Sequence, residues 1–183
     1  MRPRLRCQRS QAMTEFALVA PVLLLLTFGI LDFGRALFFY AATGDAAREG
    51  AHVAGRATSP LPTNADVRNA VAVHFPGATV TSPSPNCVNG PIPGGTPAAG
   101  AAWVFITDPN PAVAGEAAPP ANAPGGEPPP GVGGPCNLVV PAIDNQVLEV
   151  TVIYNFVPVT PLISSLVANH ILFTLRVLAR TEY

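Results

Sequence analysis

The chain has 183 residues, of which 49% are hydrophobic and only 11% are charged, and its formal net charge is -1. These values exclude an ordinary soluble domain, in which about a quarter of the residues are charged. The near-zero net charge argues against nucleic acid as a partner. A membrane protein with one modest extramembrane domain fits the length and the composition.

The N-terminus predicts the orientation of the chain. Four arginines and no acidic residue occur among residues 1–10, and such basic segments stay on the cytoplasmic side of a membrane. We therefore expect a single-pass protein of the inner (cell) membrane with a cytoplasmic N-terminus. The expected parts are a cytoplasmic basic leader (1–10), a transmembrane helix (11–35), its continuation outside the membrane (36–58) and an extracytoplasmic domain (59–183).

One carboxylate, that of Glu15, lies just inside the apolar segment. The uncharged run from Phe16 to Leu31 is about 24 Å long as a helix, which is shorter than a hydrocarbon core of about 30 Å. An ionised carboxylate at membrane depth costs about 2.5–3.5 kcal/mol. Two interpretations stay open. Glu15 either reaches the headgroups at the cytoplasmic rim or, as we prefer, awaits a cationic partner in an assembly.

Two further features interrupt the apolar segment. Pro21 has no backbone N–H and clashes with the carbonyl of Ala17, which predicts a kink or local unwinding. Asp32 and Arg35 are three residues apart at the outer boundary and can pair, which lowers the cost of both charges there. We interpret this ion pair as an interfacial anchor.

The helix is predicted to continue outside the membrane to about residue 57, since residues 36–57 contain no proline and are rich in alanine. An apolar seam with alternating spacings of four and three runs along it, with small residues in its C-terminal half. Its members are Phe33, Leu37, Tyr40, Gly44, Ala47, Ala51 and Ala54. Such a seam packs either on the protein's own domain or on another subunit, and both alternatives stay open.

The extracytoplasmic part predicts a small α+β domain. Asn64 can cap a short helix over 65–74, with Val67 and Val71 on its packing face. An antiparallel sheet of three or four strands is expected, with one polar face and with helices over its apolar face. The expected strands are 78–81, 102–107, 148–156 and 171–180, with an apolar turn or short helix at 162–168.

A Pro/Gly-rich insertion is predicted over residues 83–135, which hold 14 of the 22 prolines and 10 of the 16 glycines. Cys87 and Cys136 lie on the extracytoplasmic side, where disulfides persist, whereas Cys7 lies on the cytoplasmic side. We therefore pair Cys87 with Cys136. Closing a loop of about 50 residues would contribute about 4 kcal/mol on the chain-entropy model.

Both ends of the chain resemble the TadE-like pseudopilins, minor components of the tight-adherence (Tad, or Flp) pilus system. The specific blocks of the resemblance are 11–21, 28–36 and 46–51, and weaker matches are 150–156, Pro158, Pro161, Leu162 and the terminal strand with Arg180 and Glu182. The resemblance implies a pilin-like fold. It also implies cleavage between Ser10 and Gln11 by a membrane-embedded prepilin peptidase, although family members usually have glycine where this chain has Ser10.

The resemblance further implies that Glu15 becomes the fifth residue of the mature chain and meets the amino terminus of a neighbouring subunit. A carboxylate in low dielectric gains most from such a fixed cation. Other pilin-like subunits and the Tad secretion machinery are the partners that this role implies. The expected function is that of a minor pilin or pseudopilin in the assembly of a Tad pilus.

Other function classes fit the residues less well. One alternative is a signal-anchored surface protein whose disulfide-closed domain binds a ligand, and another is a secreted protein with a cleaved signal peptide. We expect no enzyme, cofactor or metal site, because no nucleophile with a nearby base and no metal-ligand spacing is visible. The three histidines, His52, His74 and His170, are scattered along the sequence.

Overall fold

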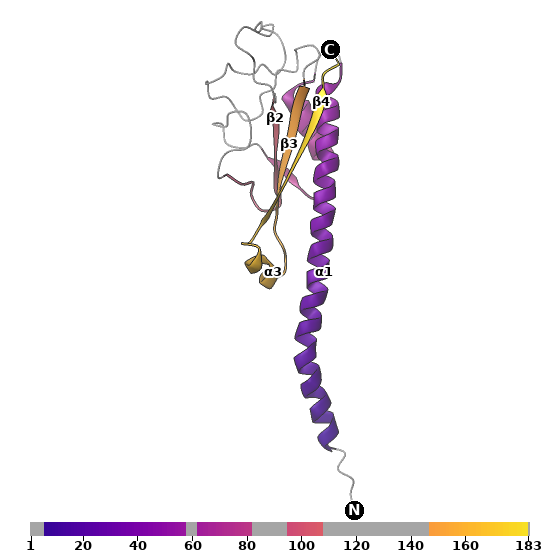
Figure 1. Ribbon diagram of the computed structural model, residues 1–183, viewed down its shortest axis with the longest axis vertical. Coiled ribbons are helices and arrows are strands. Elements are labelled where there is room, and N and C mark those ends of the chain that lie inside the picture. The colour runs from indigo at the N-terminus through magenta and orange to yellow at the C-terminus, as the bar shows by residue number, and fades with distance from the viewer. Residues whose placement is uncertain (1–5, 58–61, 82–94, 108–146, 183) are drawn as a thin grey trace, which may run out of the picture.

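The computed structural model describes residues 6–57, 62–81, 95–107 and 147–182 of the chain. These residues form one long helix, two short helices and a four-stranded sheet (Figure 1). The sheet and the short helices lie beside the C-terminal part of the long helix, whose N-terminal part extends away from them. The α+β architecture expected from the sequence is confirmed.

The long helix α1 (Arg6–Gly55) has 50 residues and is therefore about 75 Å long. It continues without interruption through Pro21, and Figure 1 shows only a gentle change of direction in its N-terminal half. Of the two effects expected at Pro21, local unwinding is therefore wrong, whereas a bend without loss of the helix is compatible with the structure. A single proline removes one hydrogen bond from the helix, and the leucine-rich turns around it are strong helix formers.

The two halves of α1 have different surroundings. Small residues in the C-terminal half are buried against the domain: Ala42, Ala46, Ala47, Ala51 and Ala54. Within the predicted seam, the small members are buried, whereas Phe33, Leu37 and Tyr40 are more than half exposed at 65%, 53% and 52%. The C-terminal part of the seam therefore packs on the protein's own domain. In its aromatic part, Tyr40 still contacts Phe173 of the sheet edge-on, with 5.8 Å between the ring centroids.

The second helix α2 (Asn64–Val73) begins one residue earlier than expected, and Thr63 caps it in place of Asn64. The Thr63 hydroxyl accepts a hydrogen bond from the Asp66 backbone N–H (3.3 Å), and the Asp66 carboxylate accepts one from the Thr63 N–H (2.8 Å). This reciprocal capping box satisfies two backbone donors at the helix start. Val67 and Val71 are buried, as the sequence predicts.

The sheet has four strands in the order β1–β2–β3–β4. Their bounds are β1 (Thr79–Thr81), β2 (Ala101–Thr107), β3 (Val147–Phe156) and β4 (Ile171–Arg180). β2, β3 and β4 pair antiparallel, whereas β1 pairs parallel with β2, so the sheet is mixed and not purely antiparallel. Three residues carry no pattern that distinguishes parallel from antiparallel pairing, which explains the difference.

One face of the sheet forms the main core with α1 and α2. Within that core, Phe39 of α1 stacks on Tyr154 of β3 with 4.9 Å between the ring centroids. The opposite face is less polar than expected, because Phe105 and Ile153 are buried there as well, with exposed fractions of 0% and 6%. Only β4 keeps the expected alternation of half-buried and exposed residues.

Candidate functional site

The N-terminal half of α1 exposes apolar side chains on all of its faces. From Met13 to Leu31 the large apolar side chains are between 45% and 77% exposed. A helix that is hydrophobic all round must be buried in another medium or partner. Within Gln11–Gly55, α1 is long and apolar enough to cross a membrane, and single-pass membrane anchoring follows from this segment.

Glu15 lies near the N-terminal end of this apolar surface and is exposed. The Gln11 side-chain amide, one turn earlier, donates a hydrogen bond to Glu15 Oε1 over 3.2 Å. A carboxylate can accept about four hydrogen bonds, so this contact leaves capacity for a further donor. Ser10 is also part of α1, so both residues of the expected processing site are in helical conformation.

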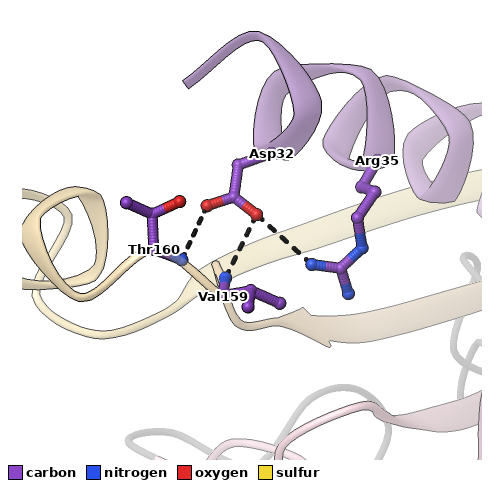
Figure 2. A network of polar contacts seen from close by, with 4 residues as sticks. All are labelled: Asp32, Arg35, Val159 and Thr160. Carbon is purple, nitrogen blue, oxygen red and sulfur yellow. Dashed lines mark hydrogen bonds and ion pairs between the residues drawn. The ribbon is translucent and has the colours of Figure 1, made fainter. Parts of the chain in front are cut away.

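Asp32 joins the membrane helix to the domain, as Figure 2 shows. Its Oδ1 accepts a hydrogen bond from the Val159 backbone N–H (3.1 Å), and its Oδ2 accepts one from the Thr160 N–H (2.9 Å). Arg35 Nη1 lies 3.3 Å from the same Oδ1. With three donors around it, the carboxylate is 5% exposed, and it clamps two segments that are far apart in the sequence.

Arg35 contributes a second link between α1 and the sheet. Its guanidinium carbon lies 5.5 Å from the centroid of the Phe156 ring at the end of β3, a cation–π distance. The side chain is 45% exposed, whereas that of Asp32 is 6% exposed. The structure therefore brings together the two residues whose spacing suggests a pair, and it adds backbone and aromatic partners.

The local sequence explains why two backbone N–H groups are free to meet Asp32. β3 ends at Phe156, and the short helix α3 (Pro161–Leu166) begins after its N-cap Thr160. The N–H groups between a strand and a helix start have no partner in either element. Pro161 at the first helical position is preorganised for the helix and fixes this turn.

The cysteines, the possible metal ligands and the pocket give no further functional site among the described residues. Cys87 and Cys136 lie outside the described residues. Within the described ranges, histidine, cysteine and acidic side chains do not gather in threes as metal ligands would. A pocket of about 280 Å³ lies at the opposite end of the domain, and the described residues that line it include no serine, threonine or cysteine. It is lined by Ala51, His52, Gly55, Arg56, Ala179, Arg180 and Glu182.

Comparison with known proteins adds one finding. The model of the TadE-like protein family matches residues 11–52, a segment that holds Glu15, Asp32 and Arg35 and most of α1. No curated protein and no solved structure shows significant similarity to the chain. The resemblance expected from the sequence is thus confirmed over the long helix, and residues 11–52 of this chain are a TadE-like segment.

Proposed function

We propose that this protein is a minor pilin or pseudopilin, anchored in the inner membrane by α1, that takes part in assembling a Tad (Flp-type) pilus. The TadE-like match over 11–52 carries the proposal, because it falls on a helix whose N-terminal half exposes its apolar side chains on all faces. The TadE-like family is structural rather than catalytic, and the role proposed here is likewise non-enzymatic.

The proposal includes maturation of the chain. A prepilin peptidase would cut between Ser10 and Gln11, which removes the basic leader and places Glu15 at the fifth position of the mature protein. The cytoplasmic orientation of that leader follows from its four arginines. Cleavage also creates a new α-amino group one helical turn from Glu15, and so a cation of the kind that a membrane carboxylate needs.

Glu15 is proposed to bind the amino terminus of a neighbouring pilin-like subunit. The exposed helix offers no cationic side chain at this depth, since no lysine or arginine occurs between Gln11 and Asp32. An intersubunit ion pair would satisfy both charges in low dielectric. The partner subunits and the Tad secretion machinery are part of this proposal.

The test is the N-terminal residue of the membrane-extracted protein, measured by intact mass and N-terminal peptide mapping in cells with and without the cognate peptidase. The expected result is a start at Gln11 that depends on the peptidase. A start at Met1 in both strains contradicts maturation, and a start near residues 40–45 contradicts membrane anchoring. Glu15→Gln should keep processing but lower incorporation into pili, with Met13→Ala at an exposed neighbouring position as the control.

A further inference from the structure

The tip of the domain, residues 159–168, lies beside the apolar part of α1. Figure 1 shows α3 next to α1 at the end of the domain that faces the helix's N-terminal half. A Cβ atom at Gly29 would lie 3.7 Å from Ile163 Cδ1 of α3. Asp32, less than one turn further along α1, binds the Val159 and Thr160 N–H groups. The tip is therefore level with Gly29–Asp32.

The thickness of a bilayer shows how deep Gly29–Asp32 and the adjacent tip lie below the outer edge of the hydrocarbon core. If Glu15 lies at the cytoplasmic edge of the hydrocarbon, a core of about 30 Å ends about 20 residues later, near Arg35. Gly29 and the adjacent Ile163 then lie about 9 Å inside the outer edge. Amphipathic elements that lie in a membrane interface reach about 5–10 Å into it.

The chemistry of the tip suits this depth. No aspartate, glutamate, lysine or arginine occurs between Glu149 and Arg176. Val159 is 71% exposed, Pro161 is exposed, and Ile163 and Val167 are half-buried. Further out along α1, apolar side chains continue beyond Asp32, with Phe33, Leu37 and Phe38 more than half exposed. Aromatic side chains are enriched where a helix leaves the membrane.

The hydrogen bonds and ion pair of Asp32 lower the cost of placing the charges of Asp32 and Arg35 at the membrane edge. Between Glu15 and Asp45, Asp32 and Arg35 are the only formally charged residues of the helix. Asp32 is enclosed by two backbone donors and Arg35, while the Arg35 guanidinium lies over Phe156. Paired charges cost far less at a membrane edge than isolated ones, and the long arginine side chain can reach toward the headgroups.

We propose that the tip, residues 159–168, is a second membrane contact that inserts into the outer leaflet of the bilayer. The occupant of this surface is lipid, because the tip continues the apolar surface of the membrane-spanning helix at the depth where that helix is still within the bilayer. Contact at both α1 and the tip fixes the angle between the domain and the membrane. The inference rests on anchoring by α1 and is independent of the pilus role.

Tryptophan quenching by brominated lipid tests the proposal. The chain has one tryptophan, Trp103, so Trp103→Phe gives a background to which Val159→Trp is added. One chain is placed in each phosphatidylcholine nanodisc, with and without bromine on the acyl chains. At a depth of about 5–10 Å, the brominated lipid should lower the emission of Val159→Trp by about half or more.

Two further variants in the same background serve as controls. Leu24→Trp, at a 57% exposed position in the middle of the apolar helix, should be quenched at least as strongly. Leu178→Trp, at a 61% exposed position of β4, should not be quenched. Its neighbour Ala179 packs near Gly55, which is about 30 Å along the helix from Arg35. Residue 178 therefore lies far outside the bilayer.

An unquenched Val159→Trp beside a quenched Leu24→Trp overturns the proposal, whether its emission is that of an aqueous or a protein-covered indole. An unquenched Leu24→Trp shows that α1 does not span, and the proposal then fails together with the anchoring. The unmodified chain gives a second measurement. Diazirine lipids should label residues 159–168 as well as the apolar half of α1, and labelling of α1 alone contradicts insertion of the tip.

Discussion

At the scale of single residues, Asp32 and Asp45 show how differently two similar pairs can act. Each aspartate is followed three residues later by an arginine that it contacts, Arg35 at 3.3 Å and Arg48 at 2.6 Å. The Asp45–Arg48 side chains are about 70% exposed, whereas the Asp32 side chain is 6% exposed. Exposed pairs contribute little to stability. We therefore expect the enclosed Asp32 carboxylate to contribute more than Asp45 to the stability of the protein.

Replacing Asp32 by alanine should therefore destabilise the junction between α1 and the domain. The Val159 and Thr160 N–H groups lose their acceptor, and unsatisfied donors away from water cost about 1–3 kcal/mol in the free energy of unfolding. Urea unfolding in nanodiscs, followed by Trp103 fluorescence, measures this cost. Faster amide exchange confined to Val159 and Thr160 identifies the donors that have lost their partner.

Asp45→Ala is the matched control for this change. It removes a pair of the same spacing from an exposed part of the same helix, so the expected cost is below about 1 kcal/mol. If Asp32→Ala and Asp45→Ala have equal effects, Asp32 does not hold the domain. The spacing of Asp32 and Arg35 could be read from the sequence, but the backbone partners lie 127 and 128 residues away and no local pattern predicts them.

At the scale of elements, α1 and α2 approach closely at a glycine that the predicted seam omitted. A Cβ atom at Gly50 would lie 2.6 Å from Val71 Cγ2 and 3.3 Å from Val150 Cγ1. Gly50→Ala should therefore force α2 or β3 to shift, at a cost of about 1–3 kcal/mol in the free energy of unfolding. The C-terminal half of the alternating seam lies on the buried face, but Gly50 falls outside its spacing and so was not among the predicted contacts.

Gly34→Ala provides the comparison for Gly50→Ala, since a Cβ at Gly34 would meet nothing within 4 Å. Both are glycines inside α1, and both substitutions raise intrinsic helix propensity by up to about 1 kcal/mol. Thermal unfolding of the two variants then separates crowding from propensity. Stabilisation by both substitutions would show that α2 is not held against Gly50.

The start of α2 predicts a dependence on pH. Hydrogen bonds from the Thr63 hydroxyl and N–H to the Asp66 carboxylate hold its pKa below the ordinary value of 3.8. A lowered folded-state pKa stabilises the helix above pH 3.8, and this contribution is lost as the pH falls through the folded-state pKa. After correction for the intrinsic pH dependence of exchange, the protection of the α2 amides should therefore fall in acid, and Asp66→Asn should abolish that loss. If Asp66→Asn shows the same loss of protection in acid, other titrating groups cause that loss.

At the scale of the whole molecule, patterns with a local cause were predictable. Apolar length identified α1, aromatic and β-branched composition identified β2, and alternation identified β3 and β4. Each of these signals lies within the segment that forms the element. The parallel pairing of β1 and the burial of Phe105 and Ile153 on the second face were not predictable. Both depend on contacts between segments distant in the sequence, which no single segment encodes.

Thiol labelling can test the cleavage of the leader and the Cys87–Cys136 disulfide in one experiment. The chain has three cysteines. If Cys87 pairs with Cys136 and the leader is removed after Ser10, the mature protein loses Cys7 and has no free thiol, whereas the uncleaved chain has one. Alkylation before reduction, followed by intact mass, should add one label in cells that lack the peptidase and none in cells that have it. Labelling of Cys87 and Cys136 before reduction would contradict the disulfide, and a persistent label on Cys7 would contradict cleavage, so each failure is distinguished by the peptide that carries it.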